Sequence, residues 1–329
     1  MAWQPDISLS GYDAALTGAA FYHVPAPGLL RIAGKDRLDF VQRQTTNDAR
    51  ALTADRALLT VLTVPTARIL DVWRLLVAPG EEALEAITLP GRGALTAQYL
   101  ARRIFFMDKV TVADASADHA QLKVLGPAAG DCLAGAGIEA LPGPGGVVTA
   151  RLDGAALRLL GPEEAFASGY LALGAPEVIA ALAGRLATWG AHPLDSAAYD
   201  ILRVEAGLPG SAGELTDAYT PLETNLDHAI HGAKGCYTGQ EIIARQITYD
   251  KITRRLAGLR LAEPVAPGAA VTVEGRGAGE VTSAAVSPRF GPLALAVIKR
   301  SHFAPGTAVS VAVDGGSVAG TVVALPFAG

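Results

Sequence analysis

The feature that most limits the possible folds is a change of sequence pattern near residue 250. From Ile252 to the end, short apolar runs rich in β-forming residues alternate with glycine- and proline-rich turns, and no helical period appears. Turns at this spacing are typical of a small antiparallel barrel. The sequence therefore predicts two regions, residues 1–250 and a C-terminal β-barrel domain at residues 251–329.

Residues 1–250 mix strand and helix patterns. Two apolar runs, Ala57–Val64 and Ile69–Ala78, flank a Pro-Thr-Ala-Arg segment and indicate a hairpin. Asp153-Gly154 separates two further strands, and Ala175–Trp189 has the pattern of a helix with a proline in its first turn. Because no regular β-α-β alternation persists, we expect an α+β fold rather than a doubly wound parallel sheet.

Composition excludes several classes of protein. Half of the residues are hydrophobic and 18% are charged, so the chain can bury a core. No apolar stretch reaches the roughly 20 residues of a membrane-spanning helix, and no basic residue precedes Arg31 to mark a targeting peptide. The two cysteines, Cys132 and Cys236, provide no disulfide framework. We therefore expect a soluble, cytoplasmic monomer that does not engage a membrane.

The segment richest in chemical information is Lys-Gly-Cys-Tyr-Thr-Gly-Gln-Glu at residues 234–241. Thr238 and Glu241 have the spacing of a capping box, in which each side chain bonds a free backbone N–H group of the first helical turn. We therefore expect a helix that starts at Gly239, with Thr238 as its N-cap residue.

Cys236 would then lie just outside the N-terminus of that helix. Tyr237 and Ile242 have the spacing of a hydrophobic staple, which supports the same helix start. The helix dipole and the nearby cation of Lys234 favour the thiolate form of the cysteine. The alternative is a buried, inert cysteine in front of an ordinary helix, which is what we expect of Cys132.

The same part of the chain is locally basic. Residues 234–260 hold six lysines and arginines against two acidic residues, although the whole chain has a net charge of −5. Such a window is either a solvated face or a site for a carboxylate, a phosphate or an RNA backbone. His228 and His231 precede Cys236 and give three candidate metal ligands, but no fourth ligand is evident. We expect no metal site.

A second candidate element is the helix expected from Asp195 to Ala206. Its apolar stripe includes Leu202 and continues to Glu205. A buried carboxylate needs partners, which are either an internal arginine or N–H donors of a ligand. Tyr199 on the same helix offers a ring for stacking, although packing in the core is the commoner role of a tyrosine.

These motifs resemble those of a known family. Residues 234–241 resemble the signature of the YgfZ family of folate-binding, iron–sulfur-cluster-assembly proteins, which are relatives of the glycine-cleavage T-protein, an aminomethyltransferase. Leu202–Gly207 resembles a segment that both groups share, and Pro221–Leu226 resembles the stretch between the two motifs. Weaker similarity extends from Ile32–Gly34 through Gln44–Asp48.

The resemblance implies a GcvT-like ring of three subdomains around a central tetrahydrofolate site. Within residues 1–250 it implies two interleaved α+β subdomains. It also implies that Cys236 is a reactive thiolate tuned by Lys234, and that Glu205 accepts hydrogen bonds from the pterin. The residues expected to bind the cofactor, tetrahydrofolate or a derivative, are Glu205, Tyr199, Tyr237 and Gln240.

The function that the resemblance implies is that of a tetrahydrofolate-binding accessory protein in the assembly or repair of iron–sulfur enzymes. Its partners would be iron–sulfur client or scaffold proteins, with a link to tRNA modification. One alternative is a folate-dependent aminomethyl- or methyltransferase, although the aspartate that T-proteins hold beside the folate amine has no equivalent in residues 89–94. The other is a non-catalytic RNA-binding module that uses Arg254 and Arg255.

Overall fold

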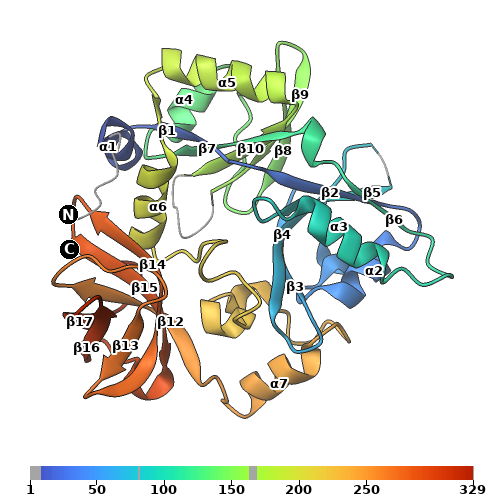
Figure 1. Cartoon of the computed structure of the whole chain (residues 1–329). Coiled ribbons are helices and arrows are strands. Elements are labelled where there is room, and N and C mark those ends of the chain that lie inside the picture. The colour runs from blue at the N-terminus through green and yellow to red at the C-terminus, as the bar shows by residue number, and fades with distance from the viewer. Residues whose placement is uncertain (1–8, 81, 163–168, 329) are drawn as a thin grey trace.

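The computed structural model describes residues 9–80, 82–162 and 169–328. The chain forms a five-stranded sheet, a six-stranded sheet and a closed barrel, which are arranged as three units around a common centre (Figure 1). The expected α+β ring with a C-terminal antiparallel barrel is therefore confirmed.

The five-stranded sheet is built around the hairpin that the sequence predicts. Its strands, in spatial order, are β3 (Leu58–Thr63), β4 (Ile69–Val77), β5 (Ala83–Thr88), β2 (Gly28–Ala33) and β6 (Thr111–Asp114). Two helices, α2 (Arg37–Gln44) and α3 (Gly93–Ala101), belong to this unit. Alternate residues of β4, Trp73 and Leu75, are buried in its core, as expected for a strand with one face toward a helix layer.

The six-stranded sheet combines segments from both sides of the first sheet in the sequence. Its strands, in spatial order, are β11 (His192–Pro193), β1 (Ala20–His23), β7 (Ala120–Leu125), β10 (Tyr170–Gly174), β9 (Ala155–Leu160) and β8 (Val147–Leu152). Its helices are α1 (Leu9–Thr17), α4 (Ala129–Gly135) and α5 (Pro176–Thr188). Asp153 and Gly154 both have left-handed backbone angles at the β8–β9 turn, which the twist of a two-residue hairpin requires.

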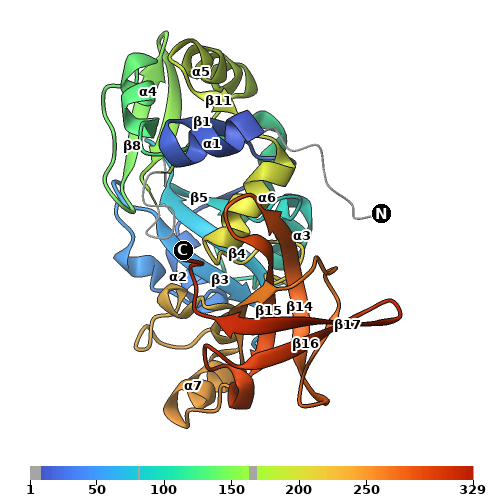
Figure 2. The same ribbon diagram turned by 90° about the vertical axis from the view of Figure 1, so that its left-hand side faces the viewer.

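The third unit is the closed antiparallel barrel. Its strands, in spatial order, are β12 (Arg254–Leu261), β15 (Gly291–Lys299), β14 (Arg276–Ser287), β13 (Ala270–Val273), β16 (Ala308–Val313) and β17 (Gly316–Val323). Its interior is filled by small and β-branched residues such as Ala278, Val281 and Ile298. The side view shows the barrel beside the two-sheet part of the molecule (Figure 2).

Two helices connect the units. Helix α6 (Ser196–Glu205) packs against α1 and against β14 and β15 of the barrel, and the Asp195 side chain caps it by accepting the N–H of Ala198 at 2.7 Å. Helix α7 (Gln240–Thr248) precedes the barrel. Short 3-10 turns occur at Ala49–Ala51, Ser116–Asp118, Pro221–Thr224, Asp227–Ala229 and Arg300–His302. No helix in the described ranges is long and apolar enough to cross a bilayer.

Candidate functional site

The two sheets face each other across a seam near the centre of the ring. Leu76 of β4 and Leu171 of β10 are part of the apolar cluster that fills it. Because side chains alternate along a strand, Arg74, two residues before Leu76, points to the same face of β4. Lys123 of β7 pairs in register with Leu171 on one side and with Tyr22 of β1 on the other. The alternation thus brings two cationic side chains toward one place.

Tyr199 of α6 completes this group. The Lys123 ammonium donates a hydrogen bond to the Tyr199 hydroxyl and lies 4.7 Å from the centroid of its ring. The Tyr199 ring stacks on Tyr22, with ring centroids 4.2 Å apart and an interplanar angle of 5°. Arg74 and Lys123 are both half-buried. We name Arg74, Lys123, Tyr199 and Tyr22 the central cluster.

Burial and the closeness of two cations dominate the electrostatics of the central cluster. Burial lowers the pKa of Lys123 to about 7, and repulsion by Arg74 is the second cause. Burial also raises the pKa of Tyr199 to about 12, so this phenol is protonated at neutral pH. In the described part of the chain no acidic side chain offsets the shift at Lys123. The cluster therefore presents hydrogen-bond donors without a matching carboxylate at the lysine.

Glu205 is buried, and its partners lie within the chain. The hydroxyls of Tyr12 on α1 and Ser287 on β14 each donate to Oε1 at 2.5 Å, and the Arg289 guanidinium lies 3.6 Å from Oε2. Burial and the bond to Glu205 raise the pKa of Tyr12. These contacts tie α6 to α1 and to the barrel, so a ligand is not needed to explain a carboxylate on this apolar stripe.

The start of α7 differs from the predicted capping box. The helix begins at Gln240, and its N-cap is Gly239, which has a left-handed φ of 83°. No side-chain cap is formed, and Glu241 instead pairs with Arg245 at 2.7 Å. The prediction of Thr238 as N-cap is therefore wrong, and the helix starts one residue later than expected.

Packing against the β3–β4 hairpin explains this difference. The Thr238 N–H donates to the Arg43 carbonyl at 3.2 Å, and the Thr238 carbonyl accepts from the Thr63 hydroxyl at 2.6 Å. A Cβ atom on Gly239 would lie 2.9 Å from the Val64 carbonyl oxygen. The segment lies so close to the hairpin turn that only glycine fits at the cap.

The predicted hydrophobic staple between Tyr237 and Ile242 is also wrong, because Ile242 is not the residue that Tyr237 packs against. Tyr237 packs with Leu222 and Ile243, whereas Ile242 is 38% exposed. Burial raises the pKa of Tyr237 to about 12. Gln240 is half-buried as the first helical residue, and its N–H donates to the Tyr237 carbonyl at 3.2 Å. The structure thus places Tyr237 in a small core and Gln240 at the helix start.

Lys234 and Cys236 point to different surroundings. Lys234 is buried, and its ammonium donates to the carbonyls of Thr45 and, at 2.7 Å, Asn47. Burial lowers its pKa to about 8. Cys236 is a free, exposed thiol, three residues before the N-cap of α7 rather than next to it. Lys234 therefore anchors the segment to the loop after α2, and the sulfur is farther along the chain from the helix end than predicted.

Sequence analysis did not single out Asp71. This residue of β4 is fully buried, and its carboxylate accepts the N–H groups of Val72 at 2.8 Å and Leu89 at 3.0 Å and the Thr96 hydroxyl at 2.6 Å. Burial raises its pKa, and these hydrogen bonds oppose the shift. An acid is thus present beside Leu89, the first of residues 89–94, and it is supplied by strand β4. Its signal in the sequence is an acidic residue within the mainly apolar run Ile69–Val77, in which Arg74 is the other charged residue.

The basic window is largely neutralised within the chain. Arg254 pairs with Glu223 at 2.7 Å and Arg255 with Asp227 at 2.6 Å, which leaves little uncompensated charge for an RNA backbone. His228 and His231 are exposed. Across residues 9–80, 82–162 and 169–328, no group of three or more His, Cys, Asp or Glu residues is placed to hold a metal ion.

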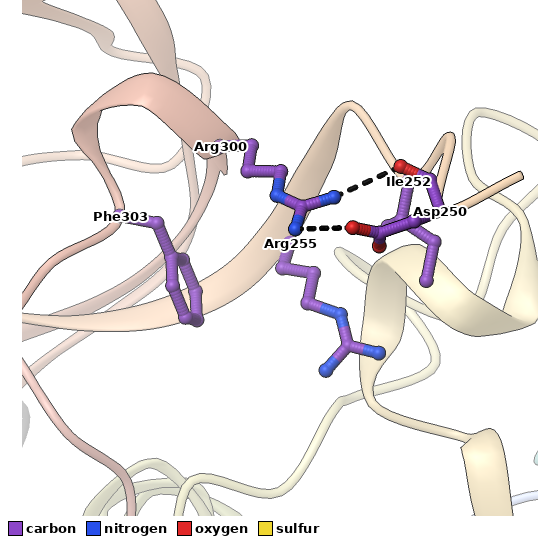
Figure 3. Close-up of a pocket in the computed structure, with 5 residues that line it drawn as sticks. All are labelled: Asp250, Ile252, Arg255, Arg300 and Phe303. Atoms are coloured by element: carbon purple, nitrogen blue, oxygen red, sulfur yellow. Dashed lines mark hydrogen bonds and ion pairs between the residues drawn. The ribbon is translucent and has the colours of Figure 1, made fainter. Parts of the chain in front are cut away.

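A cavity of about 310 Å³ lies where the chain passes from α7 to the barrel (Figure 3). The Arg300 guanidinium bonds the Asp250 carboxylate at 2.6 Å, and the Phe303 ring stands on the other side of the hollow (Figure 3). Ile252 and Arg255 complete the lining. Since Arg255 is paired with an aspartate outside the cavity, both guanidinium groups have partners within the chain.

Known proteins share this architecture. The model of the glycine cleavage T-protein C-terminal barrel domain matches residues 254–328. The crystal structure of the glycine cleavage system aminomethyltransferase T from Bartonella henselae superposes with a TM-score of 0.86, covering 97% of this chain and 89% of that one at 23% identity. The fold is therefore that of the aminomethyltransferase class.

Similarity in sequence extends along nearly the whole chain. An aminomethyltransferase of Saccharopolyspora erythraea is 31% identical over 344 residues, covering 99% of this chain and 92% of the relative. A putative chloroplastic transferase of Arabidopsis thaliana is 30% identical over 325 residues, covering 98% of this chain and 73% of the relative. The aminomethyltransferase of Bacillus subtilis is 27% identical over 351 residues, covering 99% of this chain and 93% of the relative. The chain belongs to the glycine-cleavage T-protein family of aminomethyltransferases.

Proposed function

We propose that this protein binds tetrahydrofolate at the centre of its ring and transfers a one-carbon group between that cofactor and an amine. The observation that carries the proposal is the stacked pair of Tyr22 and Tyr199 at the meeting point of the two sheets and α6, in a chain related along its length to aminomethyltransferases. The alternative of a folate-dependent transferase thus has more support than that of an accessory protein without turnover.

The residues at the centre fit a reduced folate in part. The ligand combines a flat, apolar-faced pterin with N–H groups and a carboxylate-bearing tail, which an aromatic wall and cationic donors complement. Tyr22 already covers one face of Tyr199, and the Lys123 ammonium lies over the ring, 4.7 Å from its centroid, so a pterin on the other face would lie beside that ammonium. A pterin contact by Glu205 would use Oε2, because Tyr12 and Ser287 hold Oε1.

Asp71 is the candidate acid of the proposed reaction. The resemblance to T-proteins requires an aspartate beside the folate amine, and Asp71 lies against the segment that begins at Leu89. Burial raises its pKa, which brings the carboxyl group nearer to the range where it exchanges a proton at neutral pH. Tetrahydrofolate, when bound, supplies the nitrogen that carries the one-carbon unit.

The direct test is transfer of a methylene group from an aminomethyl donor, carried on lipoamide or a free amine, to tetrahydrofolate. We expect measurable turnover with the purified chain. Tetrahydrofolate binding without turnover on either donor would contradict the transferase and leave the accessory role.

That accessory role, in iron–sulfur assembly or repair, is favoured by the position of Cys236. The thiol is exposed between two buried anchors, Lys234 and Tyr237, and exposed apolar side chains follow at Ile247 of α7 and at Tyr249, the C-cap residue of that helix. Such a surface suits contact with an iron–sulfur client or scaffold protein. In this branch, typified by the YgfZ family, the protein works in the reducing cytoplasm and its effects reach tRNA modification.

Two measurements test this second function. A Cys236→Ala variant should fail to restore the activity of an aconitase-type iron–sulfur enzyme in cells that lack the wild-type protein, and full restoration would contradict the role. The alkylation rate of Cys236 against pH, with and without tetrahydrofolate, gives its apparent pKa. A value at or above the free-thiol figure of about 8.5 would overturn the idea of an activated thiolate.

A further inference from the structure

We propose that the loop between α3 and β6 binds the surface of a lipid bilayer that contains anionic lipids. The loop ends in three consecutive apolar residues, Phe105, Phe106 and Met107, which we name the apolar tip. It lies at the outer edge of the five-stranded unit, away from the centre of the ring (Figure 1). Contact of this kind needs no membrane-spanning segment, and it departs from the expectation that the chain does not engage a membrane.

The apolar tip is exposed to an extent that is uncommon for such side chains. The exposed fractions of Phe105, Phe106 and Met107 are 67%, 98% and 72%. Among the large apolar side chains in the described ranges, Phe106 is the most exposed. Single exposed apolar residues are ordinary, but three in succession on a projecting loop form a continuous apolar surface, which marks an interaction site.

The backbone of the tip is held in place from inside the molecule. The Asp108 N–H donates to the Phe105 carbonyl at 2.9 Å, and the Asp108 carboxylate accepts the Phe105 N–H at 3.1 Å. Arg43 of α2 donates to both oxygens of that carboxylate, at 2.8 and 2.9 Å. The Lys109 N–H donates to the Asp36 carboxylate at 2.8 Å. The tip is therefore a closed turn fixed to α2, and a partner would meet a preformed surface that costs little to order.

Charge gives the tip a preference for an anionic surface. From Ala86 to Met107 the chain holds three arginines and no acidic residue, although its net charge is −5. Exposed cations lie on both sides of the tip: Arg102 precedes it and Lys109 follows it. Lys35 is also exposed, and its neighbour Asp36 donates its N–H to the Lys109 carbonyl at 3.3 Å. Each basic residue close to an anionic leaflet strengthens binding about fivefold.

The acidic side chains near the loop have partners within the chain. Asp108 is paired with Arg43, and the Asp36 carboxylate accepts a backbone N–H of the loop. Glu82 lies 3.9 Å from Arg37. The charge that the loop offers to a partner is therefore positive.

A bilayer suits this tip better than a folded protein does. The side chains of Ile104–Met107 contain no hydrogen-bonding N–H or O–H group, and the exposed face of α3 that leads to them, at Leu95, Gln98 and Ala101, carries no charge. Protein interfaces combine apolar contacts with direct hydrogen bonds, whereas a convex apolar tip enters the lipid interface without a matching pocket. A symmetric pairing with a second copy of this chain would bring two identical basic tips together, and these would repel.

The test measures co-sedimentation with vesicles of phosphatidylcholine alone and of an equimolar mixture of phosphatidylcholine and phosphatidylglycerol. The variants are Phe106→Ser, the double variant Arg102→Gln with Lys109→Gln, and the control Trp189→Ser. The control removes another aromatic side chain, which is 59% exposed at the C-cap of α5.

We expect the wild type to bind the mixed vesicles more tightly than phosphatidylcholine alone, and added salt should weaken this binding. Phe106→Ser should weaken binding to the mixed vesicles about 10- to 100-fold. The double variant should weaken it about 10- to 30-fold, and Trp189→Ser should stay close to the wild type. A thermal unfolding curve for each variant shows that the comparison is made on folded protein.

Three results would overturn the proposal. The first is a wild type that does not sediment with the mixed vesicles. The second is binding that Phe106→Ser leaves unchanged, because the contact would then be a general electrostatic one. The third is a dimer in solution that Phe106→Ser converts to a monomer, without vesicle binding, which would assign the tip to an interface between copies of the chain. Tetrahydrofolate is absent from every measurement, so the outcome is independent of the proposed function.

Discussion

The central cluster and the segment at residues 234–241 carry chemistry in opposite ways. The segment is conspicuous in the sequence, yet most of its side chains and glycines have structural roles: Lys234 and Tyr237 are anchors, and Gly239 permits close packing on a hairpin. The central cluster is drawn from four separate elements and is not recognisable as a motif. A compact motif can therefore mark how a segment is held in place, while a binding centre is assembled from residues far apart.

The largest expected effect concerns Asp71. Asp71→Asn removes the exchangeable acid and should lower the rate of one-carbon transfer by 100-fold or more, while tetrahydrofolate affinity changes little. Steady-state kinetics and calorimetry on the same preparation measure the two quantities. Asp39→Asn, at an exposed aspartate paired with Arg50, is the control and should leave both unchanged.

An Asp71→Asn variant that retains wild-type turnover but unfolds more easily would assign this residue a structural role alone. Some loss of stability is expected in any case, because an amide nitrogen cannot accept from the Thr96 hydroxyl or a backbone N–H as the carboxylate does. The readout that decides is therefore kcat at a temperature where the variant is fully folded.

Lys123 gives a prediction on pH. Its ordinary pKa is 10.5 and in the folded protein it is about 7, so between these pH values the unfolded chain binds more protons than the folded one. The free energy of unfolding should then rise from pH 7 toward pH 10.5, by about 1 kcal/mol per pH unit, and below pH 7 the full cost of the buried charge remains. This contribution should disappear in Lys123→Met.

Denaturant unfolding of the wild type and Lys123→Met at several pH values measures the contribution of Lys123 to the pH dependence of the free energy of unfolding. The groups that face the lysine are Arg74, Tyr199 and Tyr22, and both tyrosines have raised pKa values. Lys35→Met should keep the wild-type slope. If the free energies of unfolding of the wild type and Lys123→Met differ by the same amount at every pH in this range, the lysine is well solvated. The central cluster would then be no more buried than the exposed surface around Cys236.

The next largest expected effect is a loss of stability on replacing either of two glycines in the 234–241 segment, which can be compared directly with each other. Gly235 and Gly239 both have left-handed backbone angles, with φ of 94° and 83°. Around a Cβ at Gly235 there is open space, whereas at Gly239 it would meet the Val64 carbonyl at 2.9 Å and Ala67 Cα at 3.0 Å. Gly235→Ala should lower the free energy of unfolding by about 1 kcal/mol through strain alone, and Gly239→Ala by about 2 kcal/mol or more.

Urea denaturation at neutral pH measures both losses. Equal losses in the two variants would show that the segment does not press on the β3–β4 turn in solution, and the account of why the predicted capping box does not form would fail. A larger loss at Gly239 would sharpen the view that this glycine serves packing rather than a cofactor.

Local patterns predicted much of the fold because they report on local physics. The β3–β4 hairpin, the Asp153-Gly154 turn, the Asp195 cap of α6 and the barrel after residue 250 are each determined by periodicity or turn chemistry within a few residues. The start of α7 was mispredicted because tertiary contacts of Thr238 with Arg43 and Thr63 replaced the local cap. Nothing local to Glu205 indicates Tyr12, which lies far away in the sequence.

The candidate site shows the same division. The sequence indicates Tyr199 as a ring on a helix but does not single out its neighbours Lys123 and Arg74, because each is an isolated charge within a mainly apolar strand, and the two strands belong to different sheets. Asp71 belongs to the same category. Asp71 is three residues before Arg74 and lies on the other face of β4. Only the packing of the two sheets shows that Arg74 and Lys123 face one seam, and periodicity within one strand carries no information on the strand opposite.

The smallest expected effects come from the two cysteines. Cys132 is buried in the core of the six-stranded unit, where its thiol lies 3.4 Å from the Trp189 carbonyl and burial raises its pKa. Cys236 is exposed. Cys132→Ala should lower the free energy of unfolding by about 1 kcal/mol, and Cys236→Ala by less than about 0.5 kcal/mol, with tetrahydrofolate affinity unchanged in both. A loss of tetrahydrofolate affinity in Cys236→Ala would instead place the thiol in the folate site and would contradict the separation of the central cluster from the 234–241 segment.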